Sequence, residues 1–204
     1  MSRERTLEGY IHAVASSAPA PGGGSVAGVV GALSAALGQM VLNLTHAPDD
    51  NGGTRRRDLL AALQACQGRL IQAAGEDEAA YQGYRNAAAL PRGTADEKAA
   101  RRVAMQAALI AATEVPLAMA EQAARLTVLL IEVAEIGNRH LASDTALGAL
   151  LAEATLRGAL LNVRGNAALL KDPDKAQHYR EAADRLETEG RRAAATVLAV
   201  VSAS

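Results

Sequence analysis

The sequence has very few aromatic residues. Among its 204 residues there are four tyrosines and neither phenylalanine nor tryptophan, although half of the residues are hydrophobic. Alanine and leucine supply most of this apolar content, and both favour helices. The composition therefore predicts an all-α protein with closely spaced helices, and the length suits one domain over residues 1–204.

Cysteine and net charge are also scarce. Cys66 is the only cysteine, which excludes an internal disulfide and fits a reducing cytoplasm. The formal net charge is −1, which argues against a nucleic-acid-binding surface. No secretory leader pattern opens the sequence. We therefore expect a cytoplasmic protein without a nucleic-acid partner.

The four histidines lack the spacing of metal ligands, so no metal site is predicted. Arginines cluster at 55–57, 101–102 and 191–192. Each cluster is most simply a solvated helix face, and one of them can also meet an anionic part of a substrate.

Residues 19–45 are the most distinctive stretch. The turn Pro-Ala-Pro-Gly-Gly-Gly precedes Ser25, a favourable helix N-cap, and an uncharged helix follows. Small residues recur along one stripe of this helix, namely Gly24, Gly28, Gly31, Ala35 and Gly38. The stripe predicts close approach of another backbone or a flat ligand. The unpaired N–H groups at the helix start predict an anion site.

Residues 26–44 lack charge over nearly the length of a membrane span. Their high content of glycine, alanine and serine, without flanking Lys/Arg or an aromatic belt, favours a soluble protein instead. One bundle of this size has difficulty burying so apolar a helix all round. We therefore expect a homodimer that associates through this glycine-rich, small-residue helix.

A long helix over about 54–90 places an acid on its apolar seam. Leu63, Leu70, Asp77 and Tyr84 are spaced by sevens, whereas Glu76 and Glu78 are expected to point elsewhere. A carboxylate on such a seam is costly unless it is paired or used. Asp77 is therefore either an ion-pair partner of an arginine or an acid/base group.

A further helix, over about 144–170, carries small and polar residues on one face. This face comprises Asp144, Gly148, Leu151, Thr155, Gly158, Asn162 and Asn166. Asp144 alone reads as an N-cap and each asparagine alone as a surface amide, but the combination favours ligand binding.

Other helix boundaries are marked by local signals. Thr94 and Glu97 form a capping box, Gly137 is placed to end a helix, and Asp172-Pro173 marks the start of the last helix. Pro116 is expected to kink the helix that contains it.

Several motifs, in order, resemble one family. They are Pro19-x-Pro-Gly-Gly-Gly-Ser25 with Asn43-Leu-Thr45, Glu76-Asp77-x-x-Ala80-Tyr81, Leu90-Pro91, Thr94-x-x-Glu97-Lys98, Val115-Pro116-Leu117, Gly137-Asn138, Ser143-Asp144, and Asn162-Val163 with Asn166. This set resembles the cyclodeaminase domain of formiminotransferase-cyclodeaminase and the stand-alone methenyltetrahydrofolate cyclohydrolases of that family. The chain departs from the family's pattern at residues 46–53 and at Gly75.

The resemblance implies an up-and-down bundle of about six helices that dimerises and acts on a tetrahydrofolate derivative without another cofactor. It implies either hydrolysis of 5,10-methenyltetrahydrofolate to 10-formyltetrahydrofolate or cyclisation of 5-formiminotetrahydrofolate with release of ammonia. Asp77 corresponds to the family's proton-accepting residue. The expected binding residues are Gly22, Gly23, Gly24, Ser25, Asn138, Asp144, Asn162 and Asn166. The alternative is a non-catalytic helical dimer that retains the fold as a folate-binding or scaffolding module.

Overall fold

The structure is a computed structural model that describes residues 6–46 and 51–203. Within these ranges it contains helices and no strand, as the composition predicts. The elements are α1 (Leu7–Val14), α2 (Gly23–Asn43), α3 (Asn51–Ala88), α4 (Ala95–Ile136), the 3-10 helix η1 (Arg139–Leu141), α5 (Ala142–Ala167) and α6 (Pro173–Ser202).

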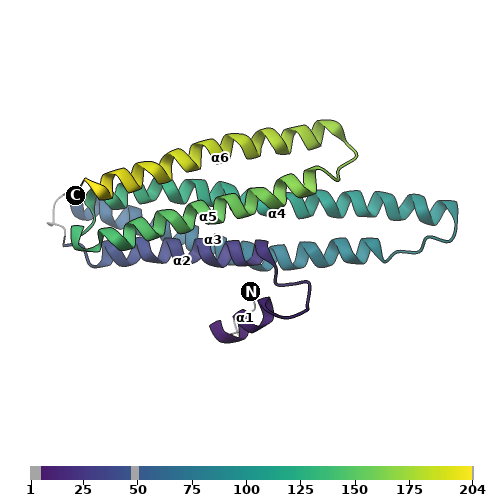
Figure 1. Cartoon of the computed structure of the whole chain (residues 1–204), viewed down its shortest axis with the longest axis horizontal. Coiled ribbons are helices and arrows are strands. Elements are labelled where there is room, and N and C mark those ends of the chain that lie inside the picture. Colours follow the sequence, from purple (N-terminus) through teal and green to yellow (C-terminus); the bar gives the residue numbers. More distant parts are fainter. Residues whose placement is uncertain (1–5, 47–50, 204) are drawn as a thin grey trace.

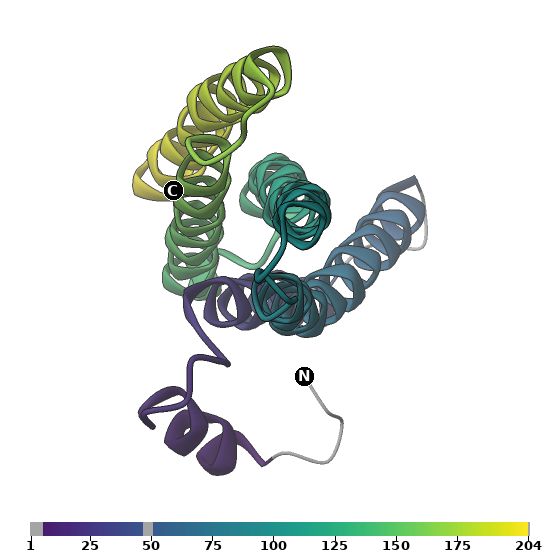
Figure 2. The same cartoon turned by 90° about the vertical axis from the view of Figure 1, so that its right-hand side faces the viewer.

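Five long helices form an elongated up-and-down bundle, and α1 stands apart from it on the side of α2 (Figure 1). Viewed end-on, α4 packs against α5 and α6 on one side and lies above α2 and α3, while its remaining side is open (Figure 2). Its central positions are fully buried, among them Met119, Leu126 and Leu130. Burial of each such side chain contributes about 1.5–3 kcal/mol, so α4 is the axis of the hydrophobic core.

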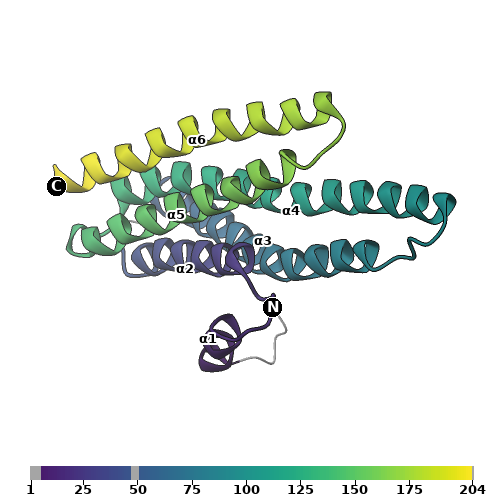
Figure 3. The same cartoon turned by 45° about the vertical axis from the view of Figure 1, so that its right-hand side comes forward.

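The hairpin of α3 and α4 extends beyond the other helices (Figures 1 and 3). The N-terminus of α2 and the C-terminus of α5 both lie against the middle of this hairpin (Figure 3). The ends of α2 and α5 therefore meet the sides of α3 and α4, and the cavity described below lies at this junction.

Most predicted helix boundaries are confirmed. The Thr94 hydroxyl accepts from the Glu97 N–H while the Glu97 carboxylate accepts from the Thr94 N–H, which completes the capping box. Asp172 caps α6 with Pro173 at its first position, and Gly137 is the C-cap of α4. Residues 46–53, where the chain departs from the family's pattern, lie partly outside the described residues, and α3 has already begun at Asn51.

The prediction of Ser25 as an N-cap is wrong. Helix α2 begins at Gly23 with Gly22 as its N-cap, so Ser25 lies inside the first turn. Its hydroxyl is bonded to side chains of α1 and α3 rather than to the backbone of its own helix. A tertiary contact has replaced the local cap.

The glycine stripe of α2 packs within the subunit. A Cβ at Gly28 would lie 2.8 Å from the Leu70 carbonyl oxygen on α3, and one at Gly31 would lie 2.8 Å from Thr155 Cγ2 on α5. The Thr155 hydroxyl donates to the Ala27 carbonyl over 3.1 Å, which the close approach permits. The close approach of another backbone that the stripe predicts is confirmed, but helices of the same chain supply it, so these glycines do not face a second chain. Dimerisation through α2 stays a prediction.

The opposite face of α2 remains apolar and exposed. Leu33, Met40 and Leu44 are at least one-third exposed. Leu147, Leu150 and Leu161 of the adjoining α5 are exposed as well. We call these six residues the α2/α5 face, and they leave the expected homodimer a different surface from the glycine stripe.

Three helical segments are long and apolar enough to cross a membrane, by length and composition alone. They are Gly23–Asn43, Ala95–Ile136 and Arg139–Ala167. The absence of a membrane partner stays a prediction.

Candidate active site

A cavity of about 310 Å³ lies where the start of α2 and the end of α5 meet the α3–α4 hairpin. This volume is at the lower end of the range for small-molecule sites. Its lining comes from four helices and the turn before α2, namely Pro19, Ala20, Gly22, Gly23, Gly24, Asp77, Glu78, Ala80, Tyr81, Tyr84, Leu109, Ala112, Asn162, Asn166 and Leu169. Six of the nine predicted site residues are in this set.

Asp77 lies against the first turn of α2. Its carboxylate accepts a hydrogen bond from the Ser25 backbone N–H. A Cβ at Gly24 would lie only 2.1 Å from Asp77 Oδ1, so the acid occupies space that only glycine leaves free. The anion site predicted at this helix terminus is therefore filled by a carboxylate of the chain itself.

Burial raises the pKa of Asp77 above its usual value, and the neighbouring Glu78 charge raises it further. The Ser25 N–H acts in the opposite sense, because it stabilises the ionised form, but the net direction is upward. No described arginine or lysine makes an ion pair with Asp77, so the ion-pair interpretation has no support in the described part of the chain. A half-buried carboxyl with a raised pKa suits proton transfer near neutral pH.

Ser25 joins α1 to the site. Its buried hydroxyl donates to Glu78 Oε1 over 3.0 Å and accepts from the Tyr10 hydroxyl, also over 3.0 Å. Tyr10 is the buried residue of α1, whereas Leu7 and Ile11 are exposed. Ser25 does not itself line the cavity, and it acts by holding Glu78 and the start of α2 in place.

The two asparagines of α5 face the cavity one turn apart. The Asn166 side-chain nitrogen donates to the Ala112 carbonyl of α4 over 2.8 Å. The Asn162 side chain has only a 3.5 Å contact with the carbonyl of Gly158. Amides can both donate and accept, so this wall can recognise a flat heterocycle by its edge.

Comparisons with known proteins show which family the chain belongs to. The family model described as formiminotransferase-cyclodeaminase matches residues 6–185. The chain belongs to this family. It is 39% identical over 175 residues to the methenyltetrahydrofolate cyclohydrolase of Methylorubrum extorquens, with 84% of each chain covered.

Two further similarities cover nearly the whole chain. The chain is 32% identical to the formimidoyltransferase-cyclodeaminase of Gallus gallus over 97% of its own length, which is 37% of the chicken protein. It superposes on the crystal structure of formiminotetrahydrofolate cyclodeaminase from Thermotoga maritima with a TM-score of 0.86. That match has 26% identity and covers 98% of this chain and 97% of the other.

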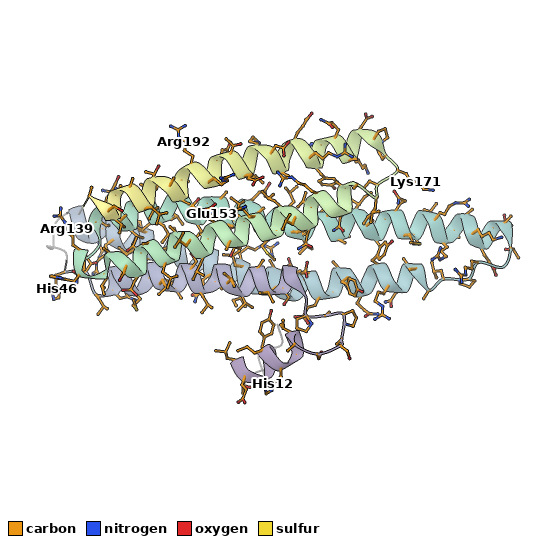
Figure 4. All side chains as sticks on the ribbon, in the orientation of Figure 1. His12, His46, Arg139, Glu153, Lys171 and Arg192 are labelled. Carbon is orange, nitrogen blue, oxygen red and sulfur yellow. The ribbon has the colours of Figure 1, made fainter. Side chains whose placement is uncertain are left out.

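Two of the binding residues that the family resemblance predicts do not lie at the cavity. Asn138 and Asp144 lie at the other end of α5 from Asn162, and the structure does not bring them to this cavity. Eighteen residues of helix separate Asp144 from Asn162, or about 27 Å. Figure 4 shows the two ends of the helix through Arg139 and Lys171, which lie far apart.

Asn138 and Asp144 have local roles where they stand. The Asn138 side chain accepts from the His140 N–H, and its backbone N–H donates to the Thr45 hydroxyl. Asp144 lies in the first turn of α5, where a negative charge is favourable, but Leu141 is the N-cap. A binding role for these two residues stays a prediction.

Sequence reasoning missed nine of the fifteen lining residues, and three of these, Glu78, Tyr81 and Tyr84, carry polar groups. Glu78 was expected to point away from the seam, yet it lines the cavity beside Asp77. Adjacent helical residues differ by about 100° in direction, and a cavity wide enough for a ligand spans both. Tyr81 and Tyr84 follow Asp77 by four and seven residues, so helical spacing, which had already placed Tyr84 on the seam, could have identified both.

The other titratable clusters are engaged elsewhere. Arg55 bonds to Glu132 and Glu135, and Arg101 donates to the Ala88 carbonyl. Arg192 projects away from the bundle in Figure 4, and His12 and His46 are far apart. Cys66 is buried, which raises the pKa of its thiol and fits a core residue. Within residues 6–46 and 51–203 no group of acids, histidines and cysteine is arranged to hold a metal ion.

Proposed function

We propose that this protein acts in folate one-carbon metabolism and hydrolyses 5,10-methenyltetrahydrofolate to 10-formyltetrahydrofolate. The observation that carries the proposal is the Asp77 carboxyl, half-buried in the cavity, held by the Ser25 N–H and raised in pKa. The methenyl group is an amidinium-like cation, so a carboxylate beside it also stabilises it electrostatically. The similarity to the Methylorubrum cyclohydrolase supports the same reaction.

In the proposed reaction, water attacks the carbon that bridges N5 and N10. Asp77 takes one water proton as the C–O bond forms, which gives a neutral tetrahedral intermediate. The bond from this carbon to N5 then breaks, and Asp77 returns the proton to N5. The second water proton leaves as the formyl carbonyl forms on N10. One water is consumed and one proton is released, so the balance contains no redox cofactor and no metal.

The cavity walls suit the rest of the substrate. Tyr84 is half-buried on α3 beside the more exposed Tyr81, and such rings can stack on a flat pterin. Asn162 and Asn166 lie on α5, where their amides can bond to the ring edge. Asp77 would then lie beside the reacting carbon. The glycines at the start of α2, which also line the cavity, leave room for the substrate to approach the backbone closely.

Cyclodeamination of 5-formiminotetrahydrofolate is the second candidate, because the Thermotoga structure bears that name. In that reaction N10 attacks the formimino carbon and ammonia leaves, and one acid/base group again suffices. Two assays separate the candidates. Loss of the near-ultraviolet absorbance of methenyltetrahydrofolate reports hydrolysis, and ammonia released from formiminotetrahydrofolate reports deamination. We expect the purified protein to accelerate the first more than the second.

A rival of another class is a non-catalytic dimer that keeps the fold to bind folate or to scaffold a partner. It predicts binding of tetrahydrofolate with no acceleration in either assay. That outcome would overturn the proposed reaction even if the ligand binds.

The raised pKa of Asp77 predicts the pH dependence of the reaction. A base must be ionised, so kcat/KM should rise with pH through the Asp77 pKa, which lies above the usual aspartate value. Glu78→Gln removes the negative charge that raises this pKa in addition to burial, so the acidic limb should move to lower pH. Glutamine Oε1 can still accept from the Ser25 hydroxyl. The pH profile of kcat/KM measures the shift, and a limb that stays in place or moves upward would contradict it.

We also propose that the protein is a cytoplasmic homodimer whose interface is the α2/α5 face. A second copy of the chain suits this surface, because α2 carries no charge and the exposed leucines continue onto α5, where Arg157 is the exposed charged residue between Leu150 and Leu161. Leu33→Glu places a charge in its middle and is expected to convert the dimer into a monomer, measured by light scattering without detergent.

The matched control for Leu33→Glu is Val103→Glu, on an exposed position of the projecting part of α4. We expect it to remain dimeric. A wild-type protein that is monomeric at micromolar concentration, or one that needs detergent, would contradict the dimer.

A further inference from the structure

Pro116 lies in the middle of α4 and is buried. Proline has no N–H, so the carbonyl of Ala112, four residues earlier, lacks the donor that a regular helix supplies. Ala112 is half-buried at the cavity wall, and a carbonyl oxygen without its helical donor is a ready acceptor for a neighbouring side chain.

Asn166 supplies the missing donor. Its Nδ2 lies 2.8 Å from the Ala112 oxygen, and both residues line the cavity. A carbonyl oxygen only accepts, so the nitrogen of the amide must face Ala112 and the oxygen must face the other way. Within the described part of the chain, no group donates to Asn166 Oδ1. The amide is thereby fixed as an acceptor for a ligand.

Asn162, one turn earlier, provides a contrast. Its 3.5 Å contact is with the Gly158 carbonyl on its own helix, which lies too far away to hold the amide firmly. Its amide can rotate to donate or accept. The two asparagines therefore differ in function, and the difference comes from a proline on another helix.

We propose that Pro116 is a positioning residue: it frees the Ala112 carbonyl to lock Asn166 as a hydrogen-bond acceptor for an N–H group of the substrate ring. This inference rests on the proposed function of the cavity for its substrate, but the locked amide itself is independent of any activity. The kink expected from Pro116 is then a by-product of freeing the carbonyl.

Kinetics test the proposal. Pro116→Ala restores an N–H that shares the Ala112 oxygen with the Asn166 amide, so the hydrogen bond that anchors Asn166 is weakened. We expect KM for methenyltetrahydrofolate to rise about 3- to 10-fold, as for one neutral hydrogen bond, with kcat changed less. Asn166→Ala should do the same, and the double variant should be no worse than Asn166→Ala alone. The control is Pro173→Ala at the first turn of α6, which frees no carbonyl and should leave KM unchanged.

Two results would overturn the proposal. The first is a KM increase in the double variant that equals the product of the increases in Pro116→Ala and Asn166→Ala. Pro116 would then act independently of Asn166, through the shape of α4 alone. The other comes from NMR of protein labelled with ¹⁵N-asparagine, in which the side-chain signals of Asn166 are assigned from Asn166→Ala. We expect these N–H protons to exchange slowly in the wild type and quickly in Pro116→Ala. Fast exchange in the wild type would disprove the lock, whether or not the protein turns over folate.

If Pro116→Ala does not fold, Asn166→Asp decides. An aspartate keeps acceptor oxygens but cannot donate to Ala112, so we expect its Kd for tetrahydrofolate, which lacks the cationic carbon, to be at least as high as that of Asn166→Ala. Binding of tetrahydrofolate at the wild-type Kd would show that the donor to Ala112 is unnecessary.

Discussion

Asp77→Asn is expected to give a folded protein whose turnover of methenyltetrahydrofolate is about 100- to 10,000-fold lower than that of the wild type. Asparagine has the shape of aspartate, and its oxygen can still accept from the Ser25 N–H. It cannot take a proton from water at neutral pH. Binding of tetrahydrofolate should therefore persist while kcat falls, which equilibrium binding and steady-state kinetics measure separately.

Stability distinguishes this result from a folding defect. The pKa of Asp77 is raised in the folded protein, so the folded state holds the proton more tightly than the unfolded chain. The free energy of unfolding is then highest below the unfolded-state pKa and falls as pH rises through the folded-state pKa. Asp77→Asn removes this loss, so at neutral pH we expect it to be at least as stable as the wild type.

Asp58→Asn is the matched control, because Asp58 is exposed on the same helix and outside the cavity. It should keep wild-type turnover. An Asp77→Asn variant that retains more than about a tenth of wild-type turnover would remove Asp77 from the role of acid and base.

Gly24→Ala is expected to lower kcat about 100-fold without unfolding the protein. The added Cβ would lie 2.1 Å from Asp77 Oδ1, a separation that real atoms do not tolerate, so the carboxyl must move. A displacement of about 1 Å at a reacting group can cost about 100-fold in rate. Alanine is the better helix former by about 1 kcal/mol, so the helix itself gains from the change. Steady-state kinetics and thermal unfolding together measure both effects.

Gly68→Ala is the control for the helix effect, because a Cβ at Gly68 meets nothing within 4 Å. It should leave turnover unchanged. If Gly24→Ala keeps more than a third of wild-type kcat, the contact between α2 and Asp77 does not set the position of the base.

Local chemistry explains which parts of the fold the sequence could predict. Thr94 with Glu97 and Asp172 with Pro173 act within a few residues of themselves, so the pattern alone specified these helix starts. Ser25 has the same local preference as Thr94, but its hydroxyl is taken by Tyr10 and Glu78, which are 15 and 53 residues away. Only the packed structure decides between these two uses of one hydroxyl.

The candidate site follows the same division. Asp77 stood out because a carboxylate on an apolar seam is unusual, and the two asparagines because their spacing puts them on one face of a helix. The resemblance grouped Asn138 and Asp144 with them, yet motif order along a chain says nothing of distance, and the straight α5 keeps them apart. Glu78 was missed because helical periodicity assigns one direction to each residue. The cavity is wide enough to be lined by two adjacent residues, Asp77 and Glu78, that point in different directions.

The contacts between α2 and α5 bear on how the protein folds. The Ser34 hydroxyl donates to the Gly148 carbonyl across 114 positions of the chain, and Thr155 reaches Ala27 across 128. Hairpins of sequential helices, such as α3 with α4, close short loops and form early, whereas contacts this distant form late and slow the overall rate. The cavity needs both kinds of contact. We therefore expect Asp77 to lie on a formed α3–α4 hairpin before the cavity exists, and catalytic competence to arrive with the long-range contacts between α2 and α5.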